Sequence, residues 1–206
     1  MARSKSSRRW LDRHVNDPYV QRAQAEGWRS RAAFKLLELD ERDRFLRPGC
    51  RVVDLGAAPG GWSQVAAARV GPTGRVIALD LLPMEPIPGV TFVLGDFRAD
   101  TVLDALRAEV GARAIDVVIS DLAPNVSGVA VVDQPRAMDL AELAVEFAGE
   151  CLVEGGTLVA KLFQGTGFDE LVAAVRRRFK RVAVRKPKAS RPESREVYLV
   201  AQGFHV

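Results

Sequence analysis

The hydrophobic pattern of the chain changes period repeatedly, and each change predicts an element of secondary structure. Short runs rich in Val and Ile alternate with longer stretches in which apolar residues recur at helical spacing. Strands are expected at 51–55, 75–80, 91–95, 115–121, 157–163, 181–185 and 195–202. Helices are expected at 62–70, 101–110, 136–153 and 167–179, and one more, capped by Ser30, at about 30–46.

The order of these elements predicts the fold class. Strands that alternate with helices are typical of a parallel sheet with helices on both faces. Only KPKASRPES separates the last two strands, and this linker is too short for a helical crossover and contains two prolines. We therefore expect an α/β fold with a mostly parallel, seven-stranded sheet that ends in an antiparallel hairpin.

Length and composition favour one domain. The chain has 206 residues, of which 48% are hydrophobic, and this suffices for one substantial core. Residues 1–17 are polar, basic and rich in serine, so we expect a flexible arm there and a single domain over 18–206. No apolar run approaches the roughly 18 to 20 residues that span a bilayer, which predicts a cytoplasmic protein. Cys50 and Cys151 form no CxxC pair, so neither a metal site nor a disulfide framework is expected.

Positive charge is concentrated in two parts of the chain. The net charge is +4, yet residues 176–195 hold ten basic residues and one acid, Glu193. A second basic cluster opens the chain and comprises Arg3, Lys5, Arg8, Arg9 and Arg13. A solvated surface would explain either cluster alone, but two clusters on one domain fit a polyanion better, because neutralising phosphates requires concentrated positive charge. The charge pattern favours a nucleic-acid partner.

The most informative motif is VVDLGAAPGGW at 52–62, a buried strand that ends in a glycine-rich loop and opens a helix. Gly56, Gly60 and Gly61 leave room for a ligand to approach the backbone at the carboxyl end of the strand, where open parallel sheets bind ligands. An acid, Asp80, closes the second strand and is placed to accept hydrogen bonds from both hydroxyls of a nucleoside ribose. Asp96 follows the third strand and is placed to meet an adenine edge.

This loop also approximates the dinucleotide fingerprint G-x-G-x-x-G, as Gly56-x-Ala58-x-x-Gly61. In that fingerprint the second glycine clears space for a pyrophosphate, whereas Ala58 and Pro59 occupy the bend in this chain. S-adenosylmethionine has no pyrophosphate and tolerates the substitution. The loop therefore favours this methyl donor over a nicotinamide cofactor.

Motifs along nearly the whole chain resemble the FtsJ/RrmJ family of 2′-O-ribose methyltransferases. The matching stretches run from about residue 10 to 203 and are SRAAFKL, VVDLGAAPGGWSQ, ALDLLPM, GDF, SDLAPNVSG, PRAM, KLFQGTGFDE, VRKPKASR and SREVYLVA. The resemblance implies a Rossmann-like class I S-adenosylmethionine-dependent methyltransferase fold, with no metal. A local departure is SRPESRE, where Pro192 and Glu193 stand in a linker that we expect to be more basic.

The family carries a Lys-Asp-Lys-Glu tetrad, which the resemblance places on Lys35, Asp121, Lys161 and Glu196. The residues themselves agree, because Asp121 and Lys161 end neighbouring predicted strands and Glu196 begins the last one. A lysine in the apolar strand TLVAKLF is costly unless it has a partner. Two explanations stay open for Lys161: a structural salt bridge to Asp121 or Glu196, and a catalytic group.

The resemblance makes Lys161 the group that acts on the attacking ribose oxygen. A neutral Lys161 would serve as the general base, and crowding by Lys35 favours neutrality. A cationic Lys161, which the neighbouring acids favour, would orient the oxygen and stabilise the developing alkoxide. The sequence leaves both mechanisms open.

The resemblance also implies the ligands. The cofactor-binding residues are Gly60, Trp62, Asp80, Asp96 and Asp121, with Gly56 in the same loop and Trp62 contributing through its backbone. The substrate would be a uridine in the A-loop of 23S rRNA, on an assembled or nearly assembled 50S subunit, and the enzyme a monomer. Relatives with the same tetrad modify tRNA or mRNA caps, which are alternative substrates. A nicotinamide oxidoreductase and a non-catalytic ribosome assembly factor are the rival classes.

Overall fold

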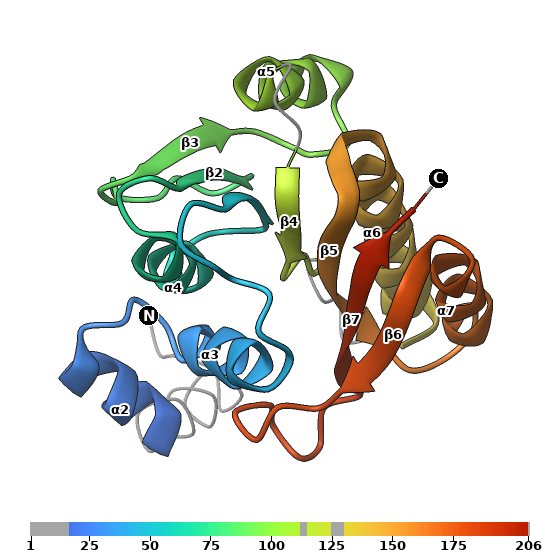
Figure 1. Ribbon diagram of the computed structural model, residues 1–206. Helices are drawn as coiled ribbons and strands as arrows, with labels where there is room; N and C mark the ends of the chain where they lie inside the picture. The colour runs from blue at the N-terminus through green and yellow to red at the C-terminus, as the bar shows by residue number, and fades with distance from the viewer. Residues whose placement is uncertain (1–16, 112–114, 125–129, 206) are drawn as a thin grey trace.

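The computed structural model describes residues 17–111, 115–124 and 130–205 (Figure 1). The first half forms α2 (Pro18–Glu26), α3 (Ala32–Asp43), β1 (Arg51–Leu55), α4 (Gly61–Val70), β2 (Arg75–Asp80), β3 (Val90–Leu94) and α5 (Asp100–Val110). The second half forms β4 (Ile115–Ser120), α6 (Ala130–Cys151), β5 (Leu152–Phe163), α7 (Phe168–Arg176), β6 (Phe179–Arg185) and β7 (Glu196–Phe204).

The strands form one seven-stranded sheet in the order β3-β2-β1-β4-β5-β7-β6. The strands from β3 to β5 are parallel to one another, whereas β7 pairs antiparallel with both β5 and β6. The predicted α/β fold, with its mostly parallel sheet and its final antiparallel hairpin, is confirmed. The second strand of the hairpin returns between β5 and β6, so β6 lies at the edge of the sheet.

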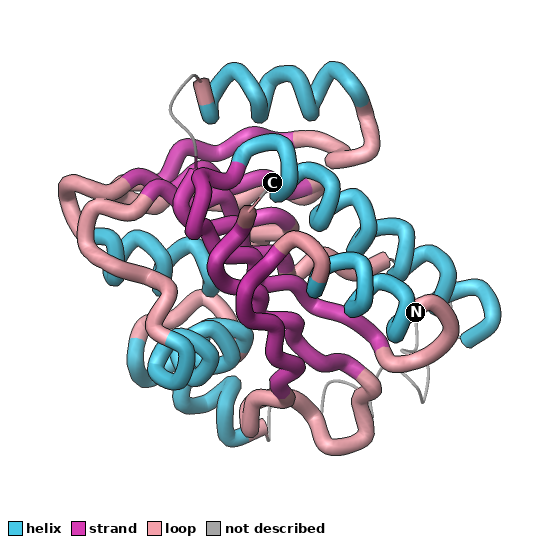
Figure 2. The backbone as a smooth tube through the Cα atoms, turned by 45° about the vertical axis from the view of Figure 1, so that its right-hand side comes forward, coloured by secondary structure: helices cyan, strands magenta, loops and turns pink. Residues whose placement is uncertain are grey.

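Helices cover both faces of the sheet, as Figures 1 and 2 show. On one face, α3 and α4 pack over a core that includes Leu36, Val52 and Tyr198. On the other face, α5, α6 and α7 pack over a larger core that includes Val53 and Leu199. Successive strand residues point to opposite faces, so the alternation along β1 and β7 decides which core each side chain joins.

The helix ahead of the sheet is shorter than the sequence predicts. It begins at Ala32, and its N-cap residue is Arg31, which makes no side-chain capping bond, so the prediction that Ser30 caps the helix is wrong. The Ser30 hydroxyl instead lies where a side chain on Gly61 would stand. The predicted cap failed because the serine packs against a distant part of the chain.

Two further differences concern one helix and one strand boundary. Helix α2 was not predicted, although Asp17 caps it by accepting from the Tyr19 N–H (3.0 Å) and Pro18 occupies its first turn. β5 begins at Leu152, five residues earlier than predicted, because a register shift lets Leu152 pair with Ile115. Except for Asp17, the predicted flexible arm lies outside the described residues.

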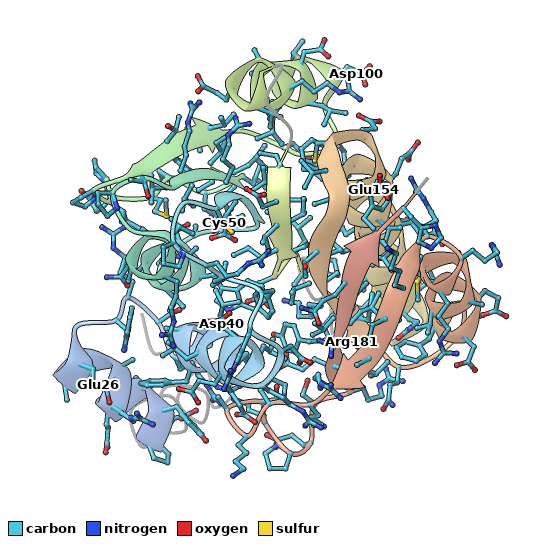
Figure 3. The ribbon with its side chains drawn as sticks, viewed as in Figure 1. Glu26, Asp40, Cys50, Asp100, Glu154 and Arg181 are labelled. Atoms are coloured by element: carbon cyan, nitrogen blue, oxygen red, sulfur yellow. The ribbon has the colours of Figure 1, made fainter. Side chains whose placement is uncertain are left out.

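Both cysteines, of which Figure 3 labels Cys50, are free thiols. Cys50 is buried just ahead of β1, and Cys151 is partly buried at the end of α6. Burial, together with the nearby charge of Glu150, raises the pKa of Cys151 to about 12. Among the described residues, no helix is long and apolar enough to cross a membrane.

Candidate active site

The candidate site lies at the carboxyl edge of the parallel strands, where open α/β sheets bind ligands. Asp121 directly follows β4, and its backbone N–H donates to the Leu55 carbonyl at the end of β1 (3.0 Å). Lys161 lies near the end of β5, in register with Tyr198 of β7, and Glu196 begins β7. Because β7 is antiparallel to β5, its first residues reach the same edge as the ends of β4 and β5.

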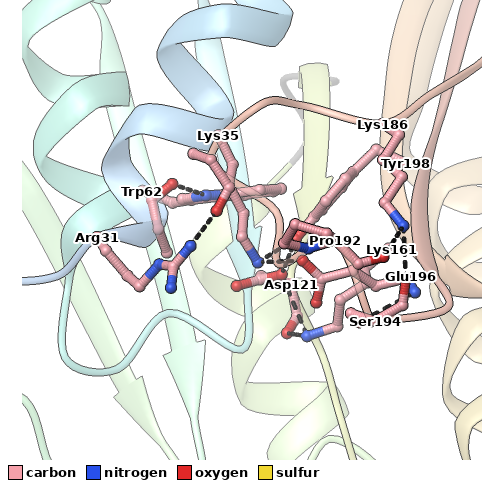
Figure 4. Close-up of polar contacts among 12 residues, drawn as sticks. Arg31, Lys35, Trp62, Asp121, Lys161, Lys186, Pro192, Ser194, Glu196 and Tyr198 are labelled. Atoms are coloured by element: carbon pink, nitrogen blue, oxygen red, sulfur yellow. Dashed lines mark hydrogen bonds and ion pairs between the residues drawn. The ribbon is translucent and has the colours of Figure 1, made fainter. Parts of the chain in front are cut away.

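The four predicted tetrad residues come together at this edge (Figure 4). The Lys161 ammonium donates to the backbone carbonyl of Asp121 (2.7 Å) and lies 3.1 Å from the Asp121 carboxylate. Lys35, on α3, donates to the Glu196 carboxylate (2.6 Å). Their side chains are 8–19% exposed. Two ion pairs, between residues up to 161 positions apart, therefore meet in a largely buried cluster.

One of the salt bridges that the sequence left open is present, since Lys161 pairs with Asp121. Glu196 pairs with Lys35 rather than with Lys161. This ion pair holds the Lys161 nitrogen at the end of β5 beside the backbone of the loop after β4. Lys161 can serve both as a structural ion-pair partner and as a catalytic amine. The contact with Asp121 that offsets the free-energy cost of burying the lysine charge also fixes the position of its nitrogen.

A fifth residue, Tyr198, connects the two ion pairs and was missed by the sequence analysis. Its hydroxyl accepts from the Lys35 ammonium (3.1 Å) and donates to the Asp121 carboxylate (2.9 Å). The side chain is fully buried and its ring packs against Trp62 at 5.6 Å. Burial, and then the charges of Asp121 and Glu196, raise the pKa of Tyr198 well above its ordinary value. The sequence carried one indication of this role. Tyr198 lies two residues after Glu196, and this spacing places both side chains on the same face of the strand.

The glycines of the loop are needed for contacts within the protein. Gly56 has a φ of 78°, and a Cβ there would stand 3.0 Å from the Leu122 backbone. A Cβ on Gly61 would collide with the Ser30 hydroxyl. The glycines were expected to let a ligand approach the backbone, whereas the structure gives them a packing role, so their place in a cofactor site stays a prediction.

A second segment covers the loop at Gly60, which has a φ of 109°. A Cβ there would stand 2.7 Å from Ile87 and 2.9 Å from Met84, both in the connection between β2 and β3. Arg29, which the sequence analysis did not single out, joins the two segments. Its guanidinium donates to the carbonyls of Pro59 (3.3 Å), Glu85 (2.5 Å) and Pro86 (2.8 Å).

Asp80 ends β2 as predicted, and both of its oxygens accept backbone hydrogen bonds. One accepts from the Ala58 N–H and the other from the Leu82 N–H, each at 2.8 Å. An ionised carboxylate has about four acceptor positions, so two remain for the hydroxyls of a ribose. The carboxylate thus shapes the glycine-rich loop and keeps capacity for a ligand.

Asp96 lies close to this point, since the Gly95 N–H donates to the Asp80 carbonyl (2.9 Å). Its carboxylate accepts from the side chain of Arg98 (2.7 and 3.0 Å) and from the Arg98 N–H (3.0 Å). These hydrogen bonds, the side-chain ones first, lower the pKa of Asp96 to about 2. Asp96 is therefore ionised at neutral pH, and a ligand would share it with Arg98.

The Trp62 indole is buried and does not line the site. It is 2% exposed, and its N–H donates to the Ala32 carbonyl (2.8 Å). The indole thereby fixes α4 against α3 and supports the ring of Tyr198. Only the backbone of Trp62 is left to act at the loop, and its role in cofactor binding stays a prediction.

Asp54, the acid within VVDLG, is a further residue of this edge that was not predicted. This side chain is completely buried, one oxygen accepts from the Ser63 hydroxyl (2.6 Å), and the other has no partner among the described residues. Burial first, and then the charges of Asp121 and Asp80, raise its pKa to about 7. Three acids are thus near enough to interact at one edge of the sheet, an arrangement that suits a cationic ligand.

The basic segment 176–195 extends along the length of the sheet. β6 begins beside Phe204 and ends beside Tyr198, so only the later residues of the segment lie near the tetrad. Arg177, Lys180 and Arg181 are exposed toward the other end of β6, where Arg181, labelled in Figure 3, lies beside Gln202. The basic residues near the tetrad are Arg185, Lys186, Lys188, Arg191 and Arg195. Arg185 pairs with Asp43, and Lys186 donates to the carbonyls of Pro192 and Ser194.

Comparison with known proteins identifies the kind of protein that has this fold and site. A model of the FtsJ-like methyltransferase family matches residues 28–204. The chain is 59% identical over 201 residues to the "Ribosomal RNA large subunit methyltransferase E" of Stenotrophomonas maltophilia, covering 98% of this chain and 96% of the relative. The protein of the same name in Legionella pneumophila is 52% identical over 206 residues, with all of both chains covered.

A solved structure shares the fold. The crystal structure described as a ribosomal RNA methyltransferase from Plasmodium falciparum has a TM-score of 0.76 and 31% identity, and the match covers 86% of this chain and 98% of that one. The sheet order, with its antiparallel last strands and flanking helices, is that of a class I methyltransferase fold. The chain belongs to the FtsJ-like methyltransferase family. The predicted family is thereby confirmed, and a methyltransferase family implies S-adenosylmethionine rather than a nicotinamide as the cofactor.

Proposed function

We propose that this protein transfers a methyl group from S-adenosylmethionine to the 2′-hydroxyl of a uridine ribose in the A-loop of 23S rRNA, on an assembled or nearly assembled large subunit. The observation that carries the proposal is the assembly of Lys35, Asp121, Lys161 and Glu196 into one buried cluster beside the glycine-rich loop. The names of the close relatives support large-subunit rRNA as the substrate.

The acids at the edge of the sheet fit the cofactor. S-adenosylmethionine, when bound, supplies a methyl group on a sulfonium that an oxygen attacks in line with the sulfur. Both the sulfonium and the amino group are cations, and Asp54, Asp80 and Asp121 lie near enough to one another to interact. In this proposal Asp80 holds the ribose, Asp96 meets the adenine, and the backbone from Gly56 through Gly60 to Trp62 lines the amino-acid end.

Lys161 acts on the attacking oxygen. A ribose hydroxyl is barely acidic, so the site must place it and deal with its proton. The Lys161 nitrogen is fixed by two oxygen atoms of Asp121, which leaves it one further direction for a substrate oxygen. Lys35, Asp121 and Glu196 hold that geometry, and such positioning alone removes a large part of a barrier. All four side chains come from one copy of the chain, so a monomer suffices for the reaction. In this proposal the reaction takes place in the cytoplasm.

The test uses ribosomal large subunits from cells that lack the gene. We expect the purified protein to transfer one labelled methyl group per subunit, at a 2′-hydroxyl of 23S rRNA, and Lys161→Ala to transfer none in the same time. Equal or faster transfer to tRNA would replace the proposed substrate with tRNA. No transfer to any RNA, together with a subunit-assembly defect that Lys161→Ala rescues, would establish the non-catalytic assembly factor instead.

A further inference from the structure

Tyr198 stands between the two ion pairs of the tetrad, and its hydroxyl is the one side-chain contact described between them. One neighbour is the Lys35 ammonium at 3.1 Å, and the other is the Asp121 carboxylate at 2.9 Å. Lys35 in turn pairs with Glu196, and Asp121 with Lys161. Among the described residues, the cluster is therefore a single chain of contacts from Glu196 to Lys161 (Figure 4).

The chemistry of the neighbours fixes the direction of these hydrogen bonds. An ammonium can only donate, so the Tyr198 oxygen accepts from Lys35. An ionised carboxylate can only accept, so the Tyr198 hydroxyl donates to Asp121. The bond to Asp121 requires a protonated phenol, and burial, followed by the charges of Asp121 and Glu196, raises the pKa of Tyr198 well above its ordinary value. The hydroxyl therefore remains a donor throughout the physiological range of pH.

We propose that Tyr198 is a positioning residue for methyl transfer, whose hydroxyl fixes the Asp121 carboxylate that in turn holds the Lys161 nitrogen at the attacking oxygen. Without this donor, the carboxylate is held by Lys161 alone and is free to rotate about its Cβ–Cγ bond. A small displacement of a reacting group lowers a rate substantially. This inference deepens the proposed function and rests on it.

The hydroxyl is distinct from the packing role of the ring. The aromatic ring packs against Trp62 and belongs to the core beneath α3 and α4. A phenylalanine would preserve that packing, since the two side chains differ by one oxygen atom. Loss of the hydroxyl also leaves no buried polar atom behind at position 198. The variant Tyr198→Phe therefore removes the positioning contact and keeps the ring.

The experiment compares Tyr198→Phe with the wild type in single-turnover methyl transfer at saturating S-adenosylmethionine and large subunits. We expect the rate constant to fall at least about tenfold, the size of one hydrogen bond to a charged group. Affinities for cofactor and subunit should stay unchanged. Tyr19→Phe, at the other tyrosine of the chain, is the matched control and should keep the wild-type rate. A wild-type rate in Tyr198→Phe overturns the inference, whereas no transfer by the wild type overturns the proposed function.

A double-mutant cycle separates positioning from a general loss of structure. If Tyr198 acts through the chain of contacts, its substitution should cost much less in a Lys35→Met background than in the wild type, because Lys35 belongs to the same unit. Independent, additive effects would overturn the inference. Should Tyr198→Phe fail to fold, 3,5-difluorotyrosine at position 198 keeps the shape and makes the phenol more acidic. Methyl transfer should then decline at a lower pH than in the wild type, and an unchanged pH profile overturns the inference.

Discussion

Asp54 and Ser63 form a completely buried hydrogen bond, in which the Ser63 hydroxyl donates to one carboxylate oxygen at 2.6 Å. The second oxygen has no partner among the described residues. A buried carboxyl with one unsatisfied oxygen favours its neutral form, and burial is the main reason that its pKa is raised to about 7. The acid beneath the glycine-rich loop therefore titrates near neutral pH.

This titration predicts how stability depends on pH. Between an ordinary pKa of 3.8 and the folded pKa of about 7, the folded protein keeps a proton that the unfolded chain releases. The contribution of Asp54 to the free energy of unfolding therefore falls as pH rises through that window. Asp54→Asn does not titrate, so its stability relative to the wild type should rise between pH 5 and pH 8, by an amount on the order of a few kcal/mol. Urea unfolding of both proteins at pH 5 and pH 8 measures this difference in the free energy of unfolding.

The variant Ser63→Ala tests the same titration of Asp54 by removing its hydrogen-bond donor. The hydrogen bond from Ser63 lowers the pKa of Asp54, so its loss should extend the decline in stability to higher pH. If the stability of Asp54→Asn relative to the wild type is the same at both pH values, Asp54 is ionised throughout and the account of its burial is wrong.

Asp80 should matter to cofactor binding in two ways. It offers acceptors to a ligand, and it holds the loop through the Ala58 and Leu82 N–H groups. Asp80→Ala removes both, and we expect the binding free energy of S-adenosylmethionine to weaken by roughly 1.5 to 3 kcal/mol. Calorimetric titration measures the change. Asp80→Asn keeps one acceptor oxygen and should bind more tightly than alanine; wild-type affinity in both variants would remove Asp80 from the site.

The strands and their order could be predicted because hydrophobic alternation and linker length are local properties of the sequence. The bounds of β1 and β2 agree with the prediction at both ends. Contacts between distant residues could not be predicted in this way, because they are not local properties of the sequence. Nothing local in Ser30 indicates that its hydroxyl packs beside Gly61, and this tertiary contact overrode the expected cap.

The same reasoning explains what was found and missed in the site. The tetrad was predicted from resemblance, whereas its pairing of Lys35 with Glu196 joins residues 161 positions apart and follows only from the fold. Tyr198 looked like an ordinary residue of an apolar strand, because its partners come from α3 and from the end of β4. Arg29 was similarly hidden, since it acts on backbone carbonyls, which carry no sequence signal.

Basic residues of the segment 176–195 lie at both ends of β6, and this placement predicts which of them contact RNA. Lys188, Arg191 and Arg195 lie in the connection at the tetrad end of β6 and β7, whereas Arg177, Lys180 and Arg181 lie toward the other end. Replacing the first three with alanine should weaken binding to large subunits and reduce its salt dependence. Each lost phosphate contact lowers the slope of log affinity against log salt by about 0.7 to 0.9.

The other three residues provide a charge-matched comparison. Their triple alanine variant loses the same net charge, so a general electrostatic attraction would change equally in both variants. We expect the variant at the tetrad end to lose more of the salt slope. Equal slopes, measured by titration of binding between low and moderate salt, would rule out a localised RNA contact at this end of the sheet.

The last prediction concerns Lys161, whose nitrogen is held by the carbonyl and the carboxylate of Asp121. If Lys161 acts on the attacking oxygen, its contribution belongs to the transition state and not to cofactor binding. Lys161→Ala should therefore lower single-turnover methyl transfer at least about a hundredfold, the lower range for positioned proton transfer or oxyanion stabilisation, with cofactor affinity unchanged. Thermal melting should show a folded protein, since Asp121 retains its hydrogen bond from Tyr198.

Lys161→Arg then separates the two mechanisms for this residue. Arginine keeps the positive charge and is effectively never deprotonated, so it can orient an oxygen but cannot accept its proton. Substantial activity in Lys161→Arg would support a cationic, orienting lysine. A loss as large as that of alanine supports a neutral base, provided that the arginine variant still binds the cofactor and the subunit like the wild type. Normal methyl transfer in Lys161→Ala would instead reduce the residue to the ion pair with Asp121, because that contact alone would then explain why a lysine stands in this strand.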